Sequence, residues 1–147
     1  MLYEVRFDIN PRSASRPRFT RAGRTYLAGP YKEFRKGMDQ LCDDLLGDDW
    51  SLIEGPLAVS TKLWTTRPKN TKLYAPKADI DNYLKAVYDS LNGRVWEDDS
   101  QVVDIFDTTK RWTESSEVPG HIDIIIERPL DFEQNEHGTW TDIRDRT

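Results

Sequence analysis

The feature that most constrains this chain is a dense acidic motif near its middle. The motif begins Lys77-Ala78-Asp79-Ile80-Asp81-Asn82, continues to Lys85, and is followed by Glu97-Asp98-Asp99. Carboxylates grouped this closely repel one another, and a bound cation relieves that repulsion. Hard divalent ions such as Mg²⁺ prefer oxygen ligands. The motif therefore predicts metal-assisted chemistry, with phosphate as the expected substrate.

Length and composition fit one globular domain. The chain has 147 residues, of which 37% are hydrophobic and 32% charged, enough to build a real core. No apolar run approaches the ~20 residues of a membrane helix, and the N-terminus lacks a signal-peptide layout. We therefore expect a cytoplasmic protein with no membrane partner. The single cysteine, Cys42, excludes an intramolecular disulfide and a cysteine-based zinc site.

Charge is distributed unevenly along the chain, although the net charge is only −5. Residues 1–36 hold nine bases and three acids, residues 37–56 hold six acids and no base, and residues 57–78 hold five bases and no acid. Local patches decide the affinity for phosphate more than the overall charge does. The two basic segments are consistent with nucleic-acid binding; the alternative is ordinary solvated surface charge.

Hydrophobic periodicity predicts an α+β fold. Alternating patterns indicate strands over 2–9, 56–64, 101–112 and 121–127, and 3.6-residue patterns indicate helices over 30–46 and 79–91. Polar loops are expected over 10–29 and 65–78. The predicted order β-α-β-α-β-β suggests a mixed sheet with the helices packed on one face.

The chain divides in sequence into a main domain, residues 1–128, and a polar C-terminal extension, residues 129–147. Pro129 ends the last predicted strand, and the segment after it shows no clear period. We expect this extension to be partly disordered.

The predicted second helix places its charges away from its apolar stripe. Asp79 is expected at the N-cap or first position, and Asp81 and Lys85 share a face one turn apart. A short return connection after the helix brings Asp99 beside Asp79 and Asp81, which predicts a three-carboxylate cup. The alternatives are simple helix capping and an ordinary Asp81–Lys85 ion pair. An EF-hand is excluded, because Leu84 stands where that loop needs glycine.

These residues resemble the RusA family of Holliday-junction resolvases. The resemblance rests on Lys77-x-Asp79-x-Asp81-Asn82-x-x-Lys85-(x)₃-Asp89-x-Leu91-Asn92-Gly93, then on Trp96-Glu97-Asp98-Asp99-x-Gln101-Val102, and on Arg16-Pro17-Arg18-Phe19 with Tyr26. It covers roughly residues 1–128. It implies a small homodimeric, Mg²⁺-dependent, structure-selective endonuclease of bacteria and their phages, so the expected location is the cytoplasm of a bacterial or phage-infected cell.

The resemblance also assigns roles to positions. Asp79, Asp81 and Asp99 match the metal-binding carboxylates of the family, and Lys85 matches its catalytic lysine. Mg²⁺ is the implied ion, with Mn²⁺ as a possible substitute. It further implies direct hydrolysis that leaves a 5′-phosphate and a 3′-hydroxyl. The role of Asp98 stays open between support of the neighbouring site and simple exposure to solvent.

Two basic strips are candidate DNA contacts. The first comprises Arg16, Arg18, Arg21 and Arg24, interleaved with Phe19 and Tyr26; the second comprises Lys69, Lys72 and Lys77, with Tyr74. Arginine and lysine suit backbone phosphates, and aromatic side chains suit stacking at an open junction centre. His121 and His137 have no partner at ligand spacing. The five tryptophans are expected to be core or interface anchors, with Trp96 of interest because it precedes the acidic cluster.

The sequence thus predicts a homodimeric endodeoxyribonuclease that resolves four-way junctions by paired symmetric nicks. A two-fold dimer suits such a substrate, because two strands are cut symmetrically. Three alternatives stay open: a junction-binding protein that has lost activity, a nuclease with a broader substrate range that cuts flaps or forks, and an acidic metal-binding domain unrelated to DNA. Phage or host origin, metal number and cleavage-sequence preference stay undetermined.

Overall fold

The structure is a computed structural model that describes residues 1–16, 18–27 and 29–145. Within these residues the main sheet has five strands in the order β1-β7-β4-β5, and β6 also pairs with β4. The strands are β1 (Tyr3–Phe7), β4 (Leu57–Thr65), β5 (Val102–Ile105), β6 (Thr109–Trp112) and β7 (His121–Glu127). β7 is antiparallel to β1 and β4, whereas β5 and β6 run parallel to β4. The predicted α+β class with a mixed sheet is confirmed.

Strand β7, which lies between β1 and β4, alternates strictly between buried and partly exposed residues. Ile122, Ile124 and Ile126 are fully buried, while the residues between them are partly exposed. A strand buried on one face alternates in this way because successive side chains point to opposite faces. The pairing of Val5 with Ile124 continues the apolar face onto β1. Slipping the register by one residue would expose all three isoleucines, so burial fixes the register.

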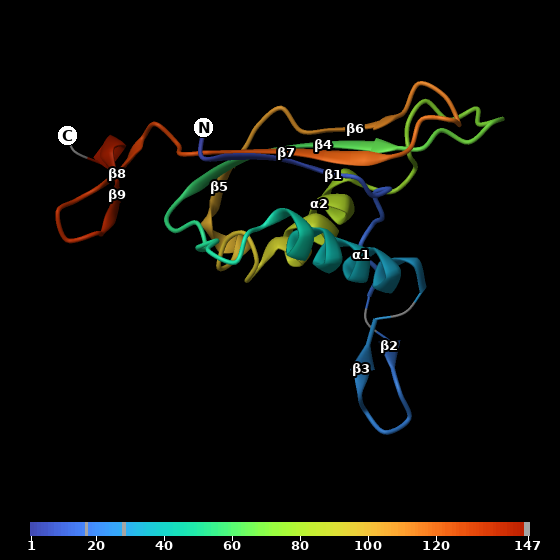
Figure 1. The fold of residues 1–147 in the computed structure, drawn as a ribbon, viewed down its shortest axis with the longest axis horizontal. Coiled ribbons are helices and arrows are strands. Elements are labelled where there is room, and N and C mark those ends of the chain that lie inside the picture. Colours follow the sequence, from blue (N-terminus) through green and yellow to red (C-terminus); the bar gives the residue numbers. More distant parts are fainter. Residues whose placement is uncertain (17, 28, 146–147) are drawn as a thin grey trace.

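Both helices lie on the same side of the sheet (Figure 1). Helix α1 (Gly29–Leu45) buries Tyr31, Phe34, Met38 and Cys42, and helix α2 (Ile80–Leu91) buries Ala86, Val87 and Leu91 among others. The buried side chains form one core cluster with the inner face of the sheet. Cys42 is fully buried, as expected for a small apolar residue of a helix.

The predicted strand 101–112 is interrupted. A short 3₁₀ helix, η1 (Asp99–Gln101), precedes β5, and residues 106–108 separate β5 from β6. Asp107 has φ +43°, a left-handed conformation that strands do not adopt. The break is held against β4 by the Ser60 hydroxyl, which donates to the Asp107 carbonyl at 2.9 Å, and by a Lys62–Asp107 ion pair at 3.2 Å.

Two small hairpins correct the sequence-based expectations. The expected loop 10–29 contains β2 (Arg18–Phe19) paired with β3 (Thr25–Tyr26), and the expected irregular extension contains β8 (Phe132–Gln134) paired with β9 (Trp140–Asp142), followed by η2 (Ile143–Asp145). Both hairpins project from the central body (Figure 1). Strands of two or three residues leave almost no periodic signal, which is why alternation did not reveal them. Residues 146 and 147 of the extension lie outside the described residues.

The C-terminal hairpin docks on the segment that precedes β4. The Arg128 guanidinium lies 4.3 Å from the centre of the Trp140 ring and donates to the Pro56 carbonyl at 2.6 Å. Burial lowers the pKa of Arg128 from its ordinary value. Gly55 approaches the same ring so closely that an added Cβ would lie 2.5 Å from it. The hairpin therefore rests on a position that only glycine can fill.

Substitution of Gly55 tests this docking. Gly55 and Gly138 share φ +82°, but an added Cβ at Gly138 would meet only Gln134 Nε2, at 3.6 Å. We expect Gly138→Ala to cost about 1 kcal/mol of unfolding free energy through its backbone conformation. We expect Gly55→Ala to cost about 2–4 kcal/mol, because the Trp140 ring must also move. Urea unfolding of both variants measures the difference; equal costs would show that the Trp140 contact adds no stability.

Candidate active site and nucleic-acid interface

The start of α2 presents two carboxylates to solvent. Asp79 is the N-cap, with extended backbone angles of φ −64° and ψ 141°, and its side chain makes no capping hydrogen bond. Its carbonyl begins the helix by accepting from the amides of Asn82 and Tyr83 at 3.1 and 3.2 Å. Asp81 lies in the first turn, and both side chains are exposed. An N-cap aspartate that does not cap is available for a ligand, and the positive end of the helix dipole favours its ionised form.

Lys85 follows on the exposed side of α2. Its ammonium lies 3.4 Å from Asp89 Oδ2, one turn further along the helix. The alternative of a simple Asp81–Lys85 ion pair is thus not the pairing that the structure shows. Asp89 also joins the two helices, because its carboxylate accepts from the Tyr31 hydroxyl at 3.5 Å and its carbonyl accepts from Arg35 at 3.3 Å. Lys85 itself is 64% exposed and can turn toward a bound phosphate.

Asp98 stabilises the short helix η1. It caps η1, where its carboxylate accepts from the Ser100 amide at 3.0 Å. Hydrogen bonding to Ser100 holds the pKa of Asp98 below its ordinary value. The Asp98 amide donates in return to Gln101 Oε1 at 3.0 Å, which completes a capping box. The Asp98 carboxylate therefore shapes the turn that carries Asp99.

Gln101 holds the acidic turn in place. Its Oε1 accepts from the amides of Glu97 and Asp98, both at 3.0 Å, and its Nε2 donates to the carbonyls of Ile53 and Gly55 at 2.9 and 3.0 Å. The carboxamide therefore uses both lone pairs and both hydrogens. It connects the turn to the same Gly55 on which the C-terminal hairpin rests. The sequence motif contains Gln101 but gives no sign of this role.

Asp99 is half-buried at the start of η1. Its charge acts on Tyr88, a largely buried residue of α2. Burial raises the pKa of Tyr88 to about 12; the Thr61 side chain opposes this shift, and the Asp99 carboxylate adds to it.

The predicted three-carboxylate cup is not closed in this structure. In the part of the chain that the structure describes, no three Asp, Glu, His or Cys side chains are close enough to hold one metal ion together. Asp79 and Asp81 sit at the start of α2, whereas Asp99 sits on η1. The donors themselves, three accessible carboxylates on adjoining elements, fit a hard divalent ion.

The first basic strip lies on the β2–β3 hairpin. Arg18, Arg21 and Arg24 are exposed, as is Arg16 just before it; residue 17 lies outside the described residues. The hairpin also exposes aromatic surface, since Phe19 is 73% and Tyr26 is 45% accessible. Figure 1 shows it extending away from the helices. An arm with guanidinium groups and exposed rings suits phosphate contact and base stacking.

One backbone bond ties this arm to the acidic site. The Ala14 amide donates to the Asn82 carbonyl in the first turn of α2 at 2.9 Å. The same incoming segment carries Arg12, whose charge reaches Tyr83 of α2. The pKa of Tyr83 is raised by burial, against the opposing effects of Thr65 and Arg12. The segment that leads into the arm is therefore held against the first turn of α2.

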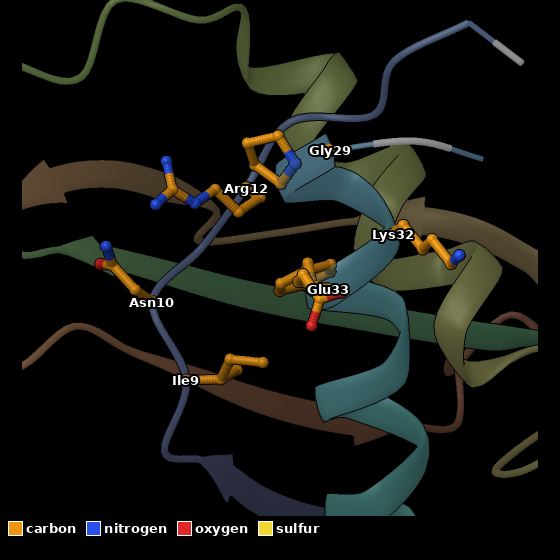
Figure 2. Close-up of a pocket in the computed structure, with 8 residues that line it drawn as sticks. Ile9, Asn10, Arg12, Gly29, Lys32 and Glu33 are labelled. Carbon is orange, nitrogen blue, oxygen red and sulfur yellow. The ribbon is translucent and has the colours of Figure 1, made fainter. Parts of the chain in front are cut away.

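A hollow of about 570 Å³ lies where the arm meets α1 (Figure 2). It is lined by Ile9, Asn10, Arg12, Gly29, Pro30, Lys32, Glu33 and Phe34. Figure 2 shows Arg12 beside the start of α1, with Lys32 and Glu33 on the helix itself. Arg12 and Lys32 were not singled out from the sequence. The signal that could have found them is the excess of basic residues over residues 1–36.

The second basic strip follows β4. Lys69, Lys72 and Lys77 are exposed on the loop that leads into α2. Tyr74 is 98% and Leu73 is 50% accessible on the same loop. The two strips thus reach the start of α2 along different segments of the chain.

Comparison with known proteins decides the family. The family model of the endodeoxyribonuclease RusA matches residues 8–127. The chain belongs to the RusA family. It is therefore an endodeoxyribonuclease of the Holliday-junction-resolvase type, and such nucleases act on branched DNA and depend in general on metal ions. The chain is also similar to YqaN, an uncharacterized protein of Bacillus subtilis strain 168, with 30% identity over 120 residues that cover 69% of this chain and 83% of YqaN.

The RusA match ends at residue 127, so the C-terminal hairpin lies beyond it. None of the described helices is long and apolar enough to cross a lipid bilayer.

Gln101→Ala tests the support of the acidic turn. The substitution leaves two amides and two carbonyls without their partner, so we expect a loss of about 1–3 kcal/mol of unfolding free energy. Gln40→Ala is the control, since Gln40 makes one exposed bond to Asp44 and should cost less than about 0.5 kcal/mol. Urea unfolding measures both. Similar costs for the two variants would mean that Gln101 does not hold the turn.

The raised pKa of Tyr88 predicts a loss of unfolding free energy at alkaline pH. An unfolded tyrosine ionises near its ordinary pKa of 10.0, whereas folded Tyr88 ionises at about 12. The contribution is fully present below pH 10 and is lost as the pH rises toward 12, amounting to about 2–3 kcal/mol. Tyr88→Phe removes this titration, so its unfolding midpoint in urea should fall less between pH 9 and pH 11.5 than that of the wild type. Parallel falls would refute the assignment.

Proposed function

We propose that this RusA-family nuclease resolves four-way DNA junctions by paired symmetric nicks, using Mg²⁺ held by Asp79, Asp81 and Asp99. The observation that carries the proposal is the joining of two features at the start of α2. Two exposed carboxylates begin the helix there, and the Ala14–Asn82 bond ties the segment that leads into the arginine-bearing arm to the same turn. Acidic side chains beside a basic surface suit a site that holds a cation and binds a polyanion.

The chemistry divides between the ion and the protein. A bound Mg²⁺, or Mn²⁺ in its place, supplies positive charge that polarises the scissile phosphate and lowers the pKa of water. Asp79 and Asp81 would orient it from the helix start, and Asp99 from η1. Lys85 would offset negative charge that develops on the phosphate in the transition state. Direct hydrolysis of this kind leaves a 5′-phosphate and a 3′-hydroxyl, and it needs no nucleophilic side chain.

The basic strips would position the DNA. Arg16, Arg18, Arg21 and Arg24 on the arm, and Lys69, Lys72 and Lys77 on the loop before α2, would contact backbone phosphates. Such contacts weaken steeply with salt. Phe19 and Tyr26 would stack on unpaired bases at the junction centre.

A junction carries two symmetry-related strands to cut, so two equivalent sites in a two-fold homodimer match it. We expect the protein to act where branched DNA occurs, in the cytoplasm of a bacterial or phage-infected cell.

The test is a cleavage assay on a synthetic four-way junction, a fork and a linear duplex, with Mg²⁺, Mn²⁺ or EDTA. We expect the wild type to nick the junction at symmetric positions with Mg²⁺ and to be inactive in EDTA. Asp81→Asn should lower the rate by about 10²-fold or more, because it removes a charged ligand. Asp43→Asn, an acidic exposed position on α1, is the control and should retain activity.

Two outcomes would overturn the proposal in different ways. If the wild type binds the junction but leaves it intact with every metal, it is a binding protein without activity. If it cuts forks or flaps in preference to the junction, the substrate is broader than a four-way junction.

A further inference from the structure

Lys110 is a basic residue that points inward. It lies on β6, an edge strand of the sheet, and its side chain is half-buried. Its ammonium donates to the carbonyls of Pro76 at 2.9 Å and Ala78 at 2.7 Å. Hydrogen bonds from a charged donor are stronger than neutral ones. Lys110 thus binds the last residues before Asp79, the N-cap of α2.

The segment that Lys110 binds has no regular structure of its own. Residues 66–78 form neither helix nor strand between β4 and α2. Other side-chain contacts also hold this segment. Near its start, Asn10 Oδ1 accepts from the Thr66 amide at 3.0 Å and Arg67 Nε donates to the Thr113 carbonyl at 3.1 Å; further along, Trp112 Nε1 donates to the Leu73 carbonyl at 2.9 Å. The part of the loop that leads into α2 is therefore held by side chains of β6. Lys110 is the contact nearest to the carboxylates.

The contact lies at the peptide that leads into Asp79. The backbone of an N-cap residue is extended rather than helical, so the preceding peptides set where its side chain points. The Ala78 carbonyl belongs to the peptide that joins residue 78 to Asp79. An ammonium that fixes this carbonyl also fixes the orientation of that peptide. Arg111, the next residue of β6, is by contrast exposed.

We propose that Lys110 is a positioning residue of this nuclease, which holds the backbone before Asp79 so that the Asp79 carboxylate faces the ion. It acts through these two carbonyls rather than by contact with DNA. The inference rests on the proposed role of Asp79. It separates Lys110 from Lys69, Lys72 and Lys77, the exposed lysines of the loop that it anchors.

Three variants of the full chain test the proposal. Lys110→Met removes the charge but keeps an unbranched side chain, Lys110→Arg keeps a donor that can reach the carbonyls, and Arg111→Met removes one charge from the neighbouring position. Two measurements apply to all of them. The first is hydrogen exchange of the amides of residues 77–82 without metal or DNA. The second is single-turnover junction cleavage across a Mg²⁺ titration, with junction affinity measured in EDTA.

For Lys110→Met we expect faster amide exchange over residues 77–82 and a cleavage rate roughly 10- to 100-fold lower, with a higher Mg²⁺ requirement. Junction affinity should stay within about threefold of the wild type, because no phosphate contact is lost. Lys110→Arg should recover most of the rate, and Arg111→Met should resemble the wild type in exchange and in Mg²⁺ requirement.

Several results would overturn the proposal. Unchanged exchange over residues 77–82 in Lys110→Met would show that the contact does not order the segment. A loss of junction affinity with an unchanged rate at saturation would make Lys110 a DNA contact. A Lys110→Arg protein that is as slow as Lys110→Met while folding normally would also refute the role. If Lys110→Met does not fold, Lys110→Arg alone decides. If the wild type does not cleave, the proposed function fails, while the exchange data still decide whether Lys110 orders the segment.

Discussion

The packing of α2 against the sheet is the constraint on which the rest of the structure depends. Ala86, Val87 and Leu91 are at most 1% exposed in the shared core. Truncating a side chain such as Leu91 to alanine costs about 2–5 kcal/mol, a large part of the stability of a small domain. Because burial fixes this face of the helix, Asp81 and Lys85 are held on the opposite face. The residues that we propose as catalytic are thus oriented by apolar contacts that take no part in the reaction.

Elements governed by burial could be predicted from the sequence. The helix ending at Leu91 and the strand His121–Glu127 both follow from local periodicity, because one buried face imposes a regular pattern on neighbouring residues. The carboxylates at the start of α2 were also found from local sequence, because a helix start has a recognisable composition. The break at Asp107 could not be read in this way, because a single left-handed residue does not disturb the pattern of apolar side chains.

Contacts between side chains and distant backbone were beyond sequence reasoning. Gln101 binds a carbonyl 48 residues earlier and Lys110 one 34 residues earlier, and nothing local marks either residue as a donor. The position of Asp99 relative to the pair at the start of α2 is a second example, because sequence gives the order of the elements but not the separation of like charges across them. Both depend on long-range geometry, which composition and period do not encode.

The two hairpins carry net charges of opposite sign. Residues 16–24 carry four arginines and no acid, or +4, whereas residues 129–145 carry five acids and Arg144, or −4. The hairpins project from separate parts of the body (Figure 1). The field of a polyanion exerts a torque on a protein whose charges are separated in this way. Screening by salt limits this effect to about one Debye length, roughly 8 Å at physiological ionic strength. In this arrangement a polyanion attracts the arginine arm and repels the C-terminal hairpin before the two surfaces touch.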